Sequence, residues 1–392
     1  MSGTIHGVEV SWERVRDLFR LDPAVAYLNH GGFGAVPVPV QLAQQRLRDE
    51  MEANPRAFFV RGLMDRIGHV RRHIATFLGA DPAGTALVPN ATAGLQVALG
   101  SFPLAEGEEI LLTDHGYGTT LFAAQRRAAR TGAVIREVDL PLGAADDEMV
   151  ELILAAVRPG RTRLAVVDHV SSPTARLLPV ARIVAALRAR GVAVLVDGAH
   201  AAGMLPVDLA AIGADFWVGN LHKWAFTPRP TAALVVAPEH RTRIEPLIVS
   251  WEQPAGFPAA VEFAGTLDYT AWLAAPTGIH VLRTLGPDRV RRHNSELADY
   301  AQLTVAAAVR ADPAELTRSE PVSMRIVPLP PGVADTVSAA DGLRDRLSAE
   351  HGCEVAVNAW RGRGYLRISA QVYNTKADVD RLAKACETIL GR

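Results

Sequence analysis

A lysine and an aspartate near the middle of the chain carry the most specific chemical signal. Asp197 follows the apolar run VAVLV, and Lys223 lies further on in GNLHKW, among aromatic and aliphatic residues. Apolar surroundings favour the uncharged, nucleophilic form of an amine. A carboxylate at a strand end can keep a pyridine nitrogen protonated through a charge-assisted hydrogen bond. This pair therefore predicts a pyridoxal 5'-phosphate (PLP) site, in which Lys223 forms a Schiff base and Asp197 contacts the ring nitrogen.

Three polar residues close to this pair are candidates for contacts with the rest of the cofactor. His200, shortly after the strand end, is expected to reach the phenolic oxygen of PLP, and the alternative is an ordinary loop histidine. His222 either contacts the cofactor phosphate or packs in the core. Asn220 is a further candidate hydrogen-bond donor to the phosphate.

The segment NATAG, residues 90–94, is the predicted phosphate cradle. Asn90, Ala91 and Thr92 open a helix directly after the strand-like run ALVP. Small residues at a helix start let backbone N–H groups approach an anion, and the helix dipole favours its charge. The alternative is an ordinary asparagine cap.

Two further segments supply candidates for the ring face and for the substrate. His115 or Tyr117, in TDHGYG, is expected to stack on the pyridine ring; Tyr117 is favoured, and the other residue is a candidate acid/base opposite Lys223. Arg367 lies within the apolar run YLRIS, where an arginine requires an anionic partner. It is expected to bind a substrate α-carboxylate, and the alternative is a structural salt bridge.

Short apolar runs that alternate with helical patterns must position these residues. Such runs predict a mostly parallel sheet covered by helices on both faces. The last two runs have no long helix between them and predict a hairpin. Amphipathic helices are predicted at 39–53 and 64–79. The predicted strands are 86–89, 109–112, 134–138, 163–168, 192–196, 215–218 and 231–236.

The pattern changes after about residue 270, where a smaller α+β lobe is predicted. Its expected helices are 287–310, 334–351 and 375–390, and its expected strands are 324–329, 354–357 and 365–369. We therefore expect an N-terminal segment, 1–22, that packs on either lobe, a large PLP-binding domain, 23–270, and a small C-terminal domain, 271–392.

Composition restricts the cellular setting and the partners. The chain has 392 residues, of which 49% are hydrophobic, so it can bury a large core. A net charge of −1 does not indicate nucleic acid or an anionic membrane. Cys353 and Cys386 lack metal-ligand spacing, and neither a signal peptide nor a membrane-spanning run is recognised. A cytoplasmic protein is therefore predicted.

Taken together, these segments resemble the class V, cysteine-desulfurase-like branch of fold-type I PLP enzymes, and within it the isopenicillin N epimerase-like proteins. The resemblance covers nearly the whole chain. It rests on the order and spacing of YLNHGGFGAVP (27–37), NPRAFFVRG (54–62), NATAG (90–94), TDHGYG (113–118), HVSSPTARLLPV (169–180), VDGAHAAGMLPVDL (196–209), GNLHKW (219–224), EFAGTLDYTAW (262–272) and LRISAQVYNT (366–375).

This resemblance implies a homodimer with active sites at the subunit interface. Thr266 matches the residue that reaches a neighbouring subunit's phosphate. Asn29 and His30 match a substrate-side loop, and Arg61 is a possible second anion contact. Ser171 and Ser172 match positions that line the ring. Two departures are noted: relatives often carry a glycine in the stretch after Lys223, and the segment 251–262 is shorter than in the epimerases, which argues against isopenicillin N itself as substrate.

The predicted activity is PLP-dependent chemistry at the α-carbon of an amino acid or an amino-acid-bearing metabolite. Epimerisation and β-elimination are favoured, including C–S cleavage of a cysteine conjugate. Transamination is an alternative, and a PLP-binding protein without turnover is less favoured. A thiol-dependent desulfurase is not expected, because its cysteine should follow the strand at 354–357, where none occurs.

Overall fold

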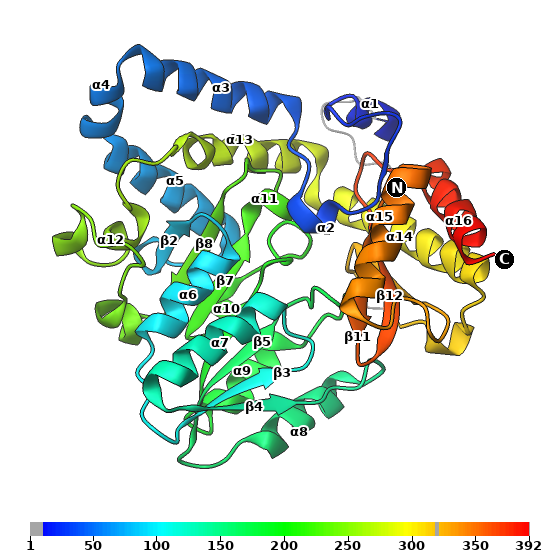
Figure 1. Cartoon of the computed structure of the whole chain (residues 1–392). Coiled ribbons are helices and arrows are strands. Elements are labelled where there is room, and N and C mark those ends of the chain that lie inside the picture. Colours follow the sequence, from blue (N-terminus) through cyan, green and yellow to red (C-terminus); the bar gives the residue numbers. More distant parts are fainter. Residues whose placement is uncertain (1–10, 318–320, 392) are drawn as a thin grey trace. The chain divides into compact units, whose positions relative to one another are not determined.

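The computed structural model describes residues 11–317 and 321–391, and these residues form two compact units (Figure 1). The larger unit contains Pro39–Ser171 and Leu178–Ile279. The smaller unit contains the described residues up to Val38, the segment Ser172–Leu177, and the described residues from His280 onward. Each unit has its own cluster of buried apolar side chains.

A seven-stranded sheet forms the centre of the larger unit, in the order β2-β8-β7-β6-β5-β3-β4. Only β8 runs antiparallel to its neighbours, and it forms a hairpin with β7. Every residue of β2, β3 and β7 is buried, as expected for strands covered on both faces. The predicted sheet and hairpin are confirmed. The strands are β2 (Thr85–Val88), β3 (Glu109–Thr113), β4 (Val134–Val138), β5 (Thr162–Asp168), β6 (Ala193–Asp197), β7 (Phe216–Asn220) and β8 (Ala232–Val236).

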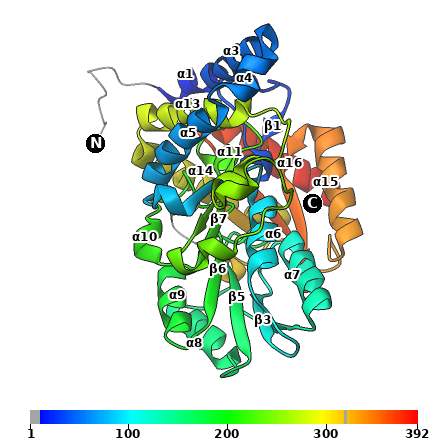
Figure 2. The same ribbon diagram turned by 90° about the vertical axis from the view of Figure 1, so that its left-hand side faces the viewer.

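Helices cover both faces of this sheet. In Figure 2, α6 (Ala91–Ser101) and α7 (Gly118–Thr131) lie on one side of the strands, and α8 (Asp146–Ala156), α9 (Val180–Arg188) and α10 (Leu209–Ile212) lie on the other. Helix α9 buries Val180, Ile183, Val184 and Leu187, which share one face at helical spacing. On α6, a Cβ atom at Gly94 would lie 2.9 Å from a Val218 methyl group, so the glycine lets this helix approach β7 closely.

The remaining helices between residues 38 and 285 include two long ones near the predicted positions. These helices are α3 (Val38–Ala53), α4 (Pro55–Val60), α5 (Leu63–Leu78), α11 (Leu221–Trp224), α12 (Ala259–Glu262) and α13 (Thr270–Leu285), with short 3₁₀ turns η1 (Pro82–Gly84), η2 (Pro238–Arg243) and η3 (Gln253–Ala255). Within the described ranges, no helix combines the length and apolar character needed to cross a membrane.

The smaller unit is built on a three-stranded antiparallel sheet with long helices. The sheet has the order β11-β12-β9, and β1 pairs with β10 in a separate parallel ribbon. Its elements are α1 (Trp12–Arg16), β1 (Ala26–Tyr27), α2 (His30–Phe33), α14 (Pro287–Val309), η4 (Pro313–Glu315), β9 (Met324–Pro328), α15 (Val337–His351), β10 (Cys353–Glu354), β11 (Ala356–Trp360), β12 (Arg363–Ser369) and α16 (Lys376–Leu390).

One predicted strand of this unit is two strands in the structure. The run at 354–357 was expected to be continuous, but Cys353–Glu354 pair with β1 whereas Ala356–Trp360 pair with β12. The strand breaks at Val355 because the chain exchanges one pairing partner for another. The expectation of a single strand is therefore wrong.

The turn after α11 is made without glycine. Phe226 adopts the left-handed conformation, with φ of 58°, and its side chain is fully buried. This conformation costs a non-glycine residue roughly 1–2 kcal/mol, which burial of an aromatic ring can offset. A Cβ atom at Gly278, on α13, would lie only 2.6 Å from the Phe226 carbonyl oxygen. The turn after α11 therefore packs closely against α13 because Gly278 has no side chain.

A buried glutamate covers the unpaired edge of β2, which is the first strand in the order of the large sheet. Glu262, at the end of α12, accepts a hydrogen bond from the Leu87 N–H at 3.0 Å. The same carboxylate oxygen lies 3.2 Å from Arg71 Nε. Burial raises the pKa of Glu262 to about 7, although Arg71 and the Leu87 N–H both act to lower it. Covering an unpaired strand edge in this way blocks pairing with other chains.

The titration of Glu262 should make the protein less stable as the pH rises. Its pKa is about 7 in the folded chain and about 4.3 in an unfolded one. Between these values the unfolded chain loses a proton that the folded chain keeps. The free energy of unfolding should therefore fall by up to about 4 kcal/mol as the pH rises through this range, and stay constant above it.

Urea unfolding of the wild type and of Glu262→Gln at several pH values tests this expectation. The amide oxygen of glutamine can still accept the Leu87 hydrogen bond. The free energy of unfolding of this variant should therefore not show the fall with rising pH that is due to Glu262. Glu151→Gln, at an exposed position on α8, should follow the wild type. Parallel pH curves for the wild type and Glu262→Gln would contradict the assignment.

Candidate active site

Lys223 lies in the short helix α11, which begins where β7 ends. Asn220 closes the strand and is the N-cap residue of the helix. Leu221 and Trp224 are buried, whereas Lys223 is half-buried, so apolar neighbours anchor the turn that presents the amine. Lys223 Nζ lies 3.4 Å from His200 Nε2. The structure therefore brings the predicted lysine and the predicted histidine together.

The orientation of His200 follows from its second neighbour. Trp224 Nε1, which can only donate, lies 3.4 Å from His200 Nδ1. A neutral His200 ring therefore carries its proton on Nε2, the nitrogen that faces Lys223. The ring is only 1% exposed, so the surrounding protein fixes its orientation. Its Nε2–H group can therefore donate to an acceptor atom that lies beside the lysine.

Asp197 is a buried carboxylate at the carboxyl end of β6. Its Oδ1 atom accepts the Ala199 N–H at 3.0 Å, and its Oδ2 atom accepts the Thr120 hydroxyl at 3.3 Å. Burial raises the pKa of Asp197, while the Ala199 N–H, the charge of Lys223 and the Thr120 hydroxyl lower it. The two hydrogen bonds come from neutral donors, so they do not cancel the negative charge. The carboxylate is therefore suited to a cationic partner.

The predicted phosphate cradle is the first turn of α6. Asn90 is the N-cap residue, and its side chain accepts the Ala93 N–H at 2.9 Å. The Ala91 N–H donates to Asn220 Oδ1 at 2.9 Å, which ties the start of α6 to the end of β7. Thr92 is exposed, and among the described residues its backbone N–H has no hydrogen-bond partner. The Thr92 N–H and the Asn220 amide group therefore remain for an anion at this helix start.

His115 and Tyr117 lie in the loop between β3 and α7 and differ in exposure. His115 is 2% exposed, and its Nε2–H donates to the Leu140 carbonyl oxygen at 2.8 Å. The Ser171 hydroxyl donates to the His115 carbonyl oxygen at 3.0 Å. Tyr117 is 49% exposed and directly precedes α7. His115 thus fixes the loop, whereas the Tyr117 ring lies at the surface of the larger unit.

The structure gives the other predicted residues of the larger unit different environments. His222 is buried, its Nδ1–H donates to the Thr231 carbonyl oxygen at 2.9 Å, and burial lowers its pKa to about 4. A neutral ring in this position ties α11 to Thr231, the residue directly before β8. Thr266 is exposed in the loop between α12 and α13, and Arg61 is exposed at the end of α4. The side chains of Thr266 and Arg61 are therefore accessible to a ligand or a partner.

Arg367 lies on β12 in the smaller unit and is 5% exposed. Its Nη1 atom donates to the Ser172 carbonyl oxygen at 2.7 Å and to the Ser172 hydroxyl at 2.9 Å. Its Nη2 atom donates to Asn29 Oδ1 at 3.2 Å. Three predicted residues therefore meet here, and the oxygen atoms named hold the guanidinium in one orientation.

His30, also predicted, is fully buried in a hydrogen-bond network of the smaller unit. Gln371 Oε1 accepts hydrogen bonds from Asn294 Nδ2 and from the Val372 N–H, so the Gln371 amide group donates to His30 Nε2 at 3.1 Å. His30 Nδ1 therefore carries the proton and donates to the Tyr373 hydroxyl at 2.8 Å. Both ring nitrogens are engaged in these hydrogen bonds, and Asn29 is the adjacent residue in the chain.

Sequence reasoning missed two residues around Asp197. Thr120 binds its carboxylate, and Asp168 is its neighbour on β5. The signal for Asp168 was present, because Asp168 ends RLAVVD just as Asp197 follows VAVLV. No comparable signal marks Thr120, since a threonine in a helix is common.

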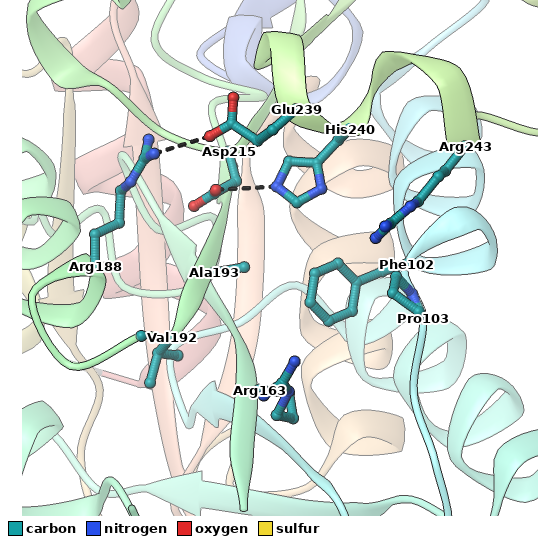
Figure 3. Close-up of a pocket in the computed structure, with 11 residues that line it drawn as sticks. Phe102, Pro103, Arg163, Arg188, Val192, Ala193, Asp215, Glu239, His240 and Arg243 are labelled. Carbon is teal, nitrogen blue, oxygen red and sulfur yellow. Dashed lines mark hydrogen bonds and ion pairs between the residues drawn. The ribbon is translucent and has the colours of Figure 1, made fainter. Parts of the chain in front are cut away.

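A separate cavity of about 310 Å³ lies at the opposite, amino-terminal edge of the sheet (Figure 3). There Asp215 accepts the Val194 N–H at 2.8 Å and pairs with His240 at 3.1 Å. Glu239 pairs with Arg188 at 2.9 Å. Asp215 therefore links the start of β6 to η2, and Glu239 links η2 to the end of α9. The cavity contains none of the predicted residues, and ligands of open α/β sheets bind at the carboxyl ends instead.

The residues at the carboxyl edge fit PLP in three respects. The buried Asp197 carboxylate suits a protonated ring nitrogen. The His200 Nε2–H group suits the phenolic oxygen beside Lys223. Thr92 and Asn220, at the start of α6, suit the phosphate.

Comparisons with known proteins identify the family of this chain. Residues 27–382 match the family model described as "Aminotransferase class-V". The chain is 35% identical to isopenicillin N epimerase of Streptomyces clavuligerus, with 97% of this chain and 98% of the relative covered. It is 31% identical to putative L-cysteine desulfhydrase 2 of Oryza sativa subsp. japonica, with 93% and 84% covered.

Solved structures show the same fold. The cystine C-S lyase C-DES, in a complex with its product cysteine persulfide, has a TM-score of 0.79 at 21% identity, with 93% of this chain and 97% of that chain covered. The cysteine desulfurase CsdA of Escherichia coli has a TM-score of 0.77 at 22% identity, with 97% and 99% covered. The chain therefore belongs to the aminotransferase class-V family of fold-type I enzymes, and its cofactor is pyridoxal 5'-phosphate.

Proposed function

We propose that this enzyme acts at the α-carbon of an amino acid or of a metabolite that carries an amino-acid group. The observation that carries the proposal is that Lys223 Nζ lies 3.4 Å from His200 Nε2, beside the buried Asp197 carboxylate on which the lysine charge acts. When bound, PLP withdraws electrons from the substrate α-carbon and weakens its bonds. Asp197 holds the ring nitrogen in its protonated state. Lys223 Nζ removes or returns the α-proton.

The two outcomes that we propose are epimerisation and β-elimination with C–S cleavage. Relatives named for both reactions match nearly the whole chain. Both begin with loss of the α-proton. In epimerisation a second group returns a proton to the opposite face, whereas in β-elimination a substituent leaves the neighbouring carbon. Transamination is the remaining alternative.

We propose that Tyr117, rather than His115, stacks on the ring. The His115 side chain is buried and engaged with the Leu140 carbonyl oxygen, whereas the Tyr117 ring is half exposed. A ring that is not committed to the protein interior can cover a cofactor face, which contributes roughly 0.5–1.5 kcal/mol beyond burial. His115 then positions the loop.

Arg367 is our proposed ligand for the substrate carboxylate, with Asn29 beside it. The hydrogen bonds that Arg367 donates to Ser172 and Asn29 fix the plane of the guanidinium, which favours bidentate recognition. His30 supports Asn29 from the core. Arg61, at the exposed end of α4, is proposed as a second anion contact.

Neither cysteine supports a thiol-dependent desulfurase. Cys353 is fully buried and Cys386 is 3% exposed. Burial raises the pKa of the Cys353 thiol, and it raises that of Cys386 to about 12. Because the thiolate is the nucleophile, both groups are poorly suited to attack a substrate sulfur.

We further propose a cytoplasmic homodimer. Exposed apolar residues on the larger unit, which are Leu247, Ile248, Val249 and Trp251, support an interface with a second copy. Thr266, also exposed, is proposed to contact the partner's cofactor phosphate. The net charge of −1 does not favour nucleic acid or anionic membranes as partners. A single-chain mass in analytical ultracentrifugation would contradict the dimer.

The reaction type is tested by proton exchange at the substrate α-carbon. In heavy water, the holoenzyme should exchange the α-proton of at least one member of a panel that contains amino acids, cysteine conjugates and isopenicillin N. Inversion identifies an epimerase, and release of pyruvate or a thiol identifies a lyase. Lys223→Ala should lower the exchange rate by about 10³-fold. An enzyme with bound PLP that exchanges no α-proton would contradict the proposal.

The role of Arg367 is tested by Arg367→Lys. Lysine keeps the charge but loses the planar fork, so KM for the exchanged substrate should rise about 10–100-fold, with a smaller change in kcat. Arg363→Lys is the matched control, because Arg363 lies on the same strand and pairs with Glu315 at the surface. It should leave the kinetics unchanged. An unaltered KM in Arg367→Lys would rule out carboxylate binding by this residue.

A further inference from the structure

A second aspartate lies beside Asp197, and the mechanism above does not use it. Asp168 ends β5 as Asp197 ends β6, and the two residues are partners in the parallel register. Neighbouring strands lie about 4.8 Å apart, and paired residues point to the same face of the sheet. Asp168 is 5% exposed and Asp197 is 4% exposed. Two carboxyl groups therefore share one buried sheet edge.

The loop that carries His115 and Tyr117 lies against the Asp168 carboxyl group. A Cβ atom added at Gly116 would lie 4.0 Å from Asp168 Oδ2. The carboxyl group is thus kept from water by protein on this side as well. Two adjacent carboxylates in such a site repel each other, and one of them takes up a proton.

Hydrogen bonding decides which carboxyl group is the ionised one. Asp197 accepts bonds from the Ala199 N–H and the Thr120 hydroxyl, and the charge of Lys223 also favours its anion. For Asp168, its own backbone N–H is the group that favours ionisation. Burial raises the pKa of Asp168 well above its usual range, and the charge of Asp197 raises it further.

We propose that Asp168 remains a neutral carboxylic acid at physiological pH and is a positioning residue that leaves Asp197 as the single anion facing the cofactor ring nitrogen. This inference rests on the proposed function, which assigns Asp197 to that nitrogen. An ionised Asp168 would place a second negative charge at the same edge. The ionised Asp168 would also attract the positive charge of the ring. The pH at which the bound cofactor changes its absorbance would therefore shift.

Two variants and two spectroscopic readouts test this proposal. Asp168→Asn imitates the neutral acid, and Asp168→Ala removes the polar group. Infrared spectra of the wild type, with and without PLP, should contain a protonated-carboxyl band that shifts in heavy water and is lost in Asp168→Asn. The pH dependence of cofactor absorbance should be the same in Asp168→Asn as in the wild type. PLP affinity should fall about tenfold in Asp168→Ala and be restored in Asp168→Asn.

Either of two results would overturn the proposal. One is an infrared spectrum in which no protonated-carboxyl band is lost on replacing Asp168 by Asn. The other is a shift of the cofactor's absorbance transition in Asp168→Asn as large as that in Asp197→Asn. The infrared band of the PLP-free protein does not depend on turnover. If the wild type binds PLP but exchanges no α-proton, the proposed function is wrong. The infrared measurement still decides whether Asp168 is protonated.

Discussion

The buried carboxylate at the end of β6 is the constraint on which the rest of the site depends. Removing a carboxylate from water costs several kcal/mol, and neutral donors such as the Ala199 N–H and the Thr120 hydroxyl offset only part of that cost. We propose that the positively charged ring nitrogen of PLP supplies the remaining partner. In that role, Asp197 would favour cofactor binding and keep the ring in the state that accepts electrons. This one proposed interaction would link the stability of the holoenzyme to its chemistry.

The parallel sheet explains why the other groups lie close to this carboxylate. Parallel strands end at one edge, so the segments that follow β5, β6 and β7 are neighbours although they are distant in sequence. Asn220 links the end of β7 to the start of α6, which places the proposed phosphate contact relative to Lys223. Phe226 and Gly278 then shape the turn after the lysine. Local backbone geometry and long-range register together position the amine.

Much of this arrangement could be predicted from the sequence, because its signals are local. Asp197 ends one apolar run and Lys223 lies shortly after another, and both runs are strands in the structure. What could not be predicted depends on pairing across strands. The register that brings Asp168 beside Asp197 is a tertiary property, as is the exchange of partners at Val355. The burial of His30 likewise follows from residues near the other end of the chain, Gln371 and Tyr373.

A Schiff base between Lys223 and PLP is tested most directly by reducing the holoenzyme with borohydride and mapping the labelled peptide. The chain contains three lysines, and the other two, Lys376 and Lys384, lie on α16 in the smaller unit. We expect a reduced PLP group on the peptide that contains Lys223, and on no other peptide. Protein that stays colourless when supplied with PLP, or that carries the reduced group on Lys376 or Lys384, would contradict the account.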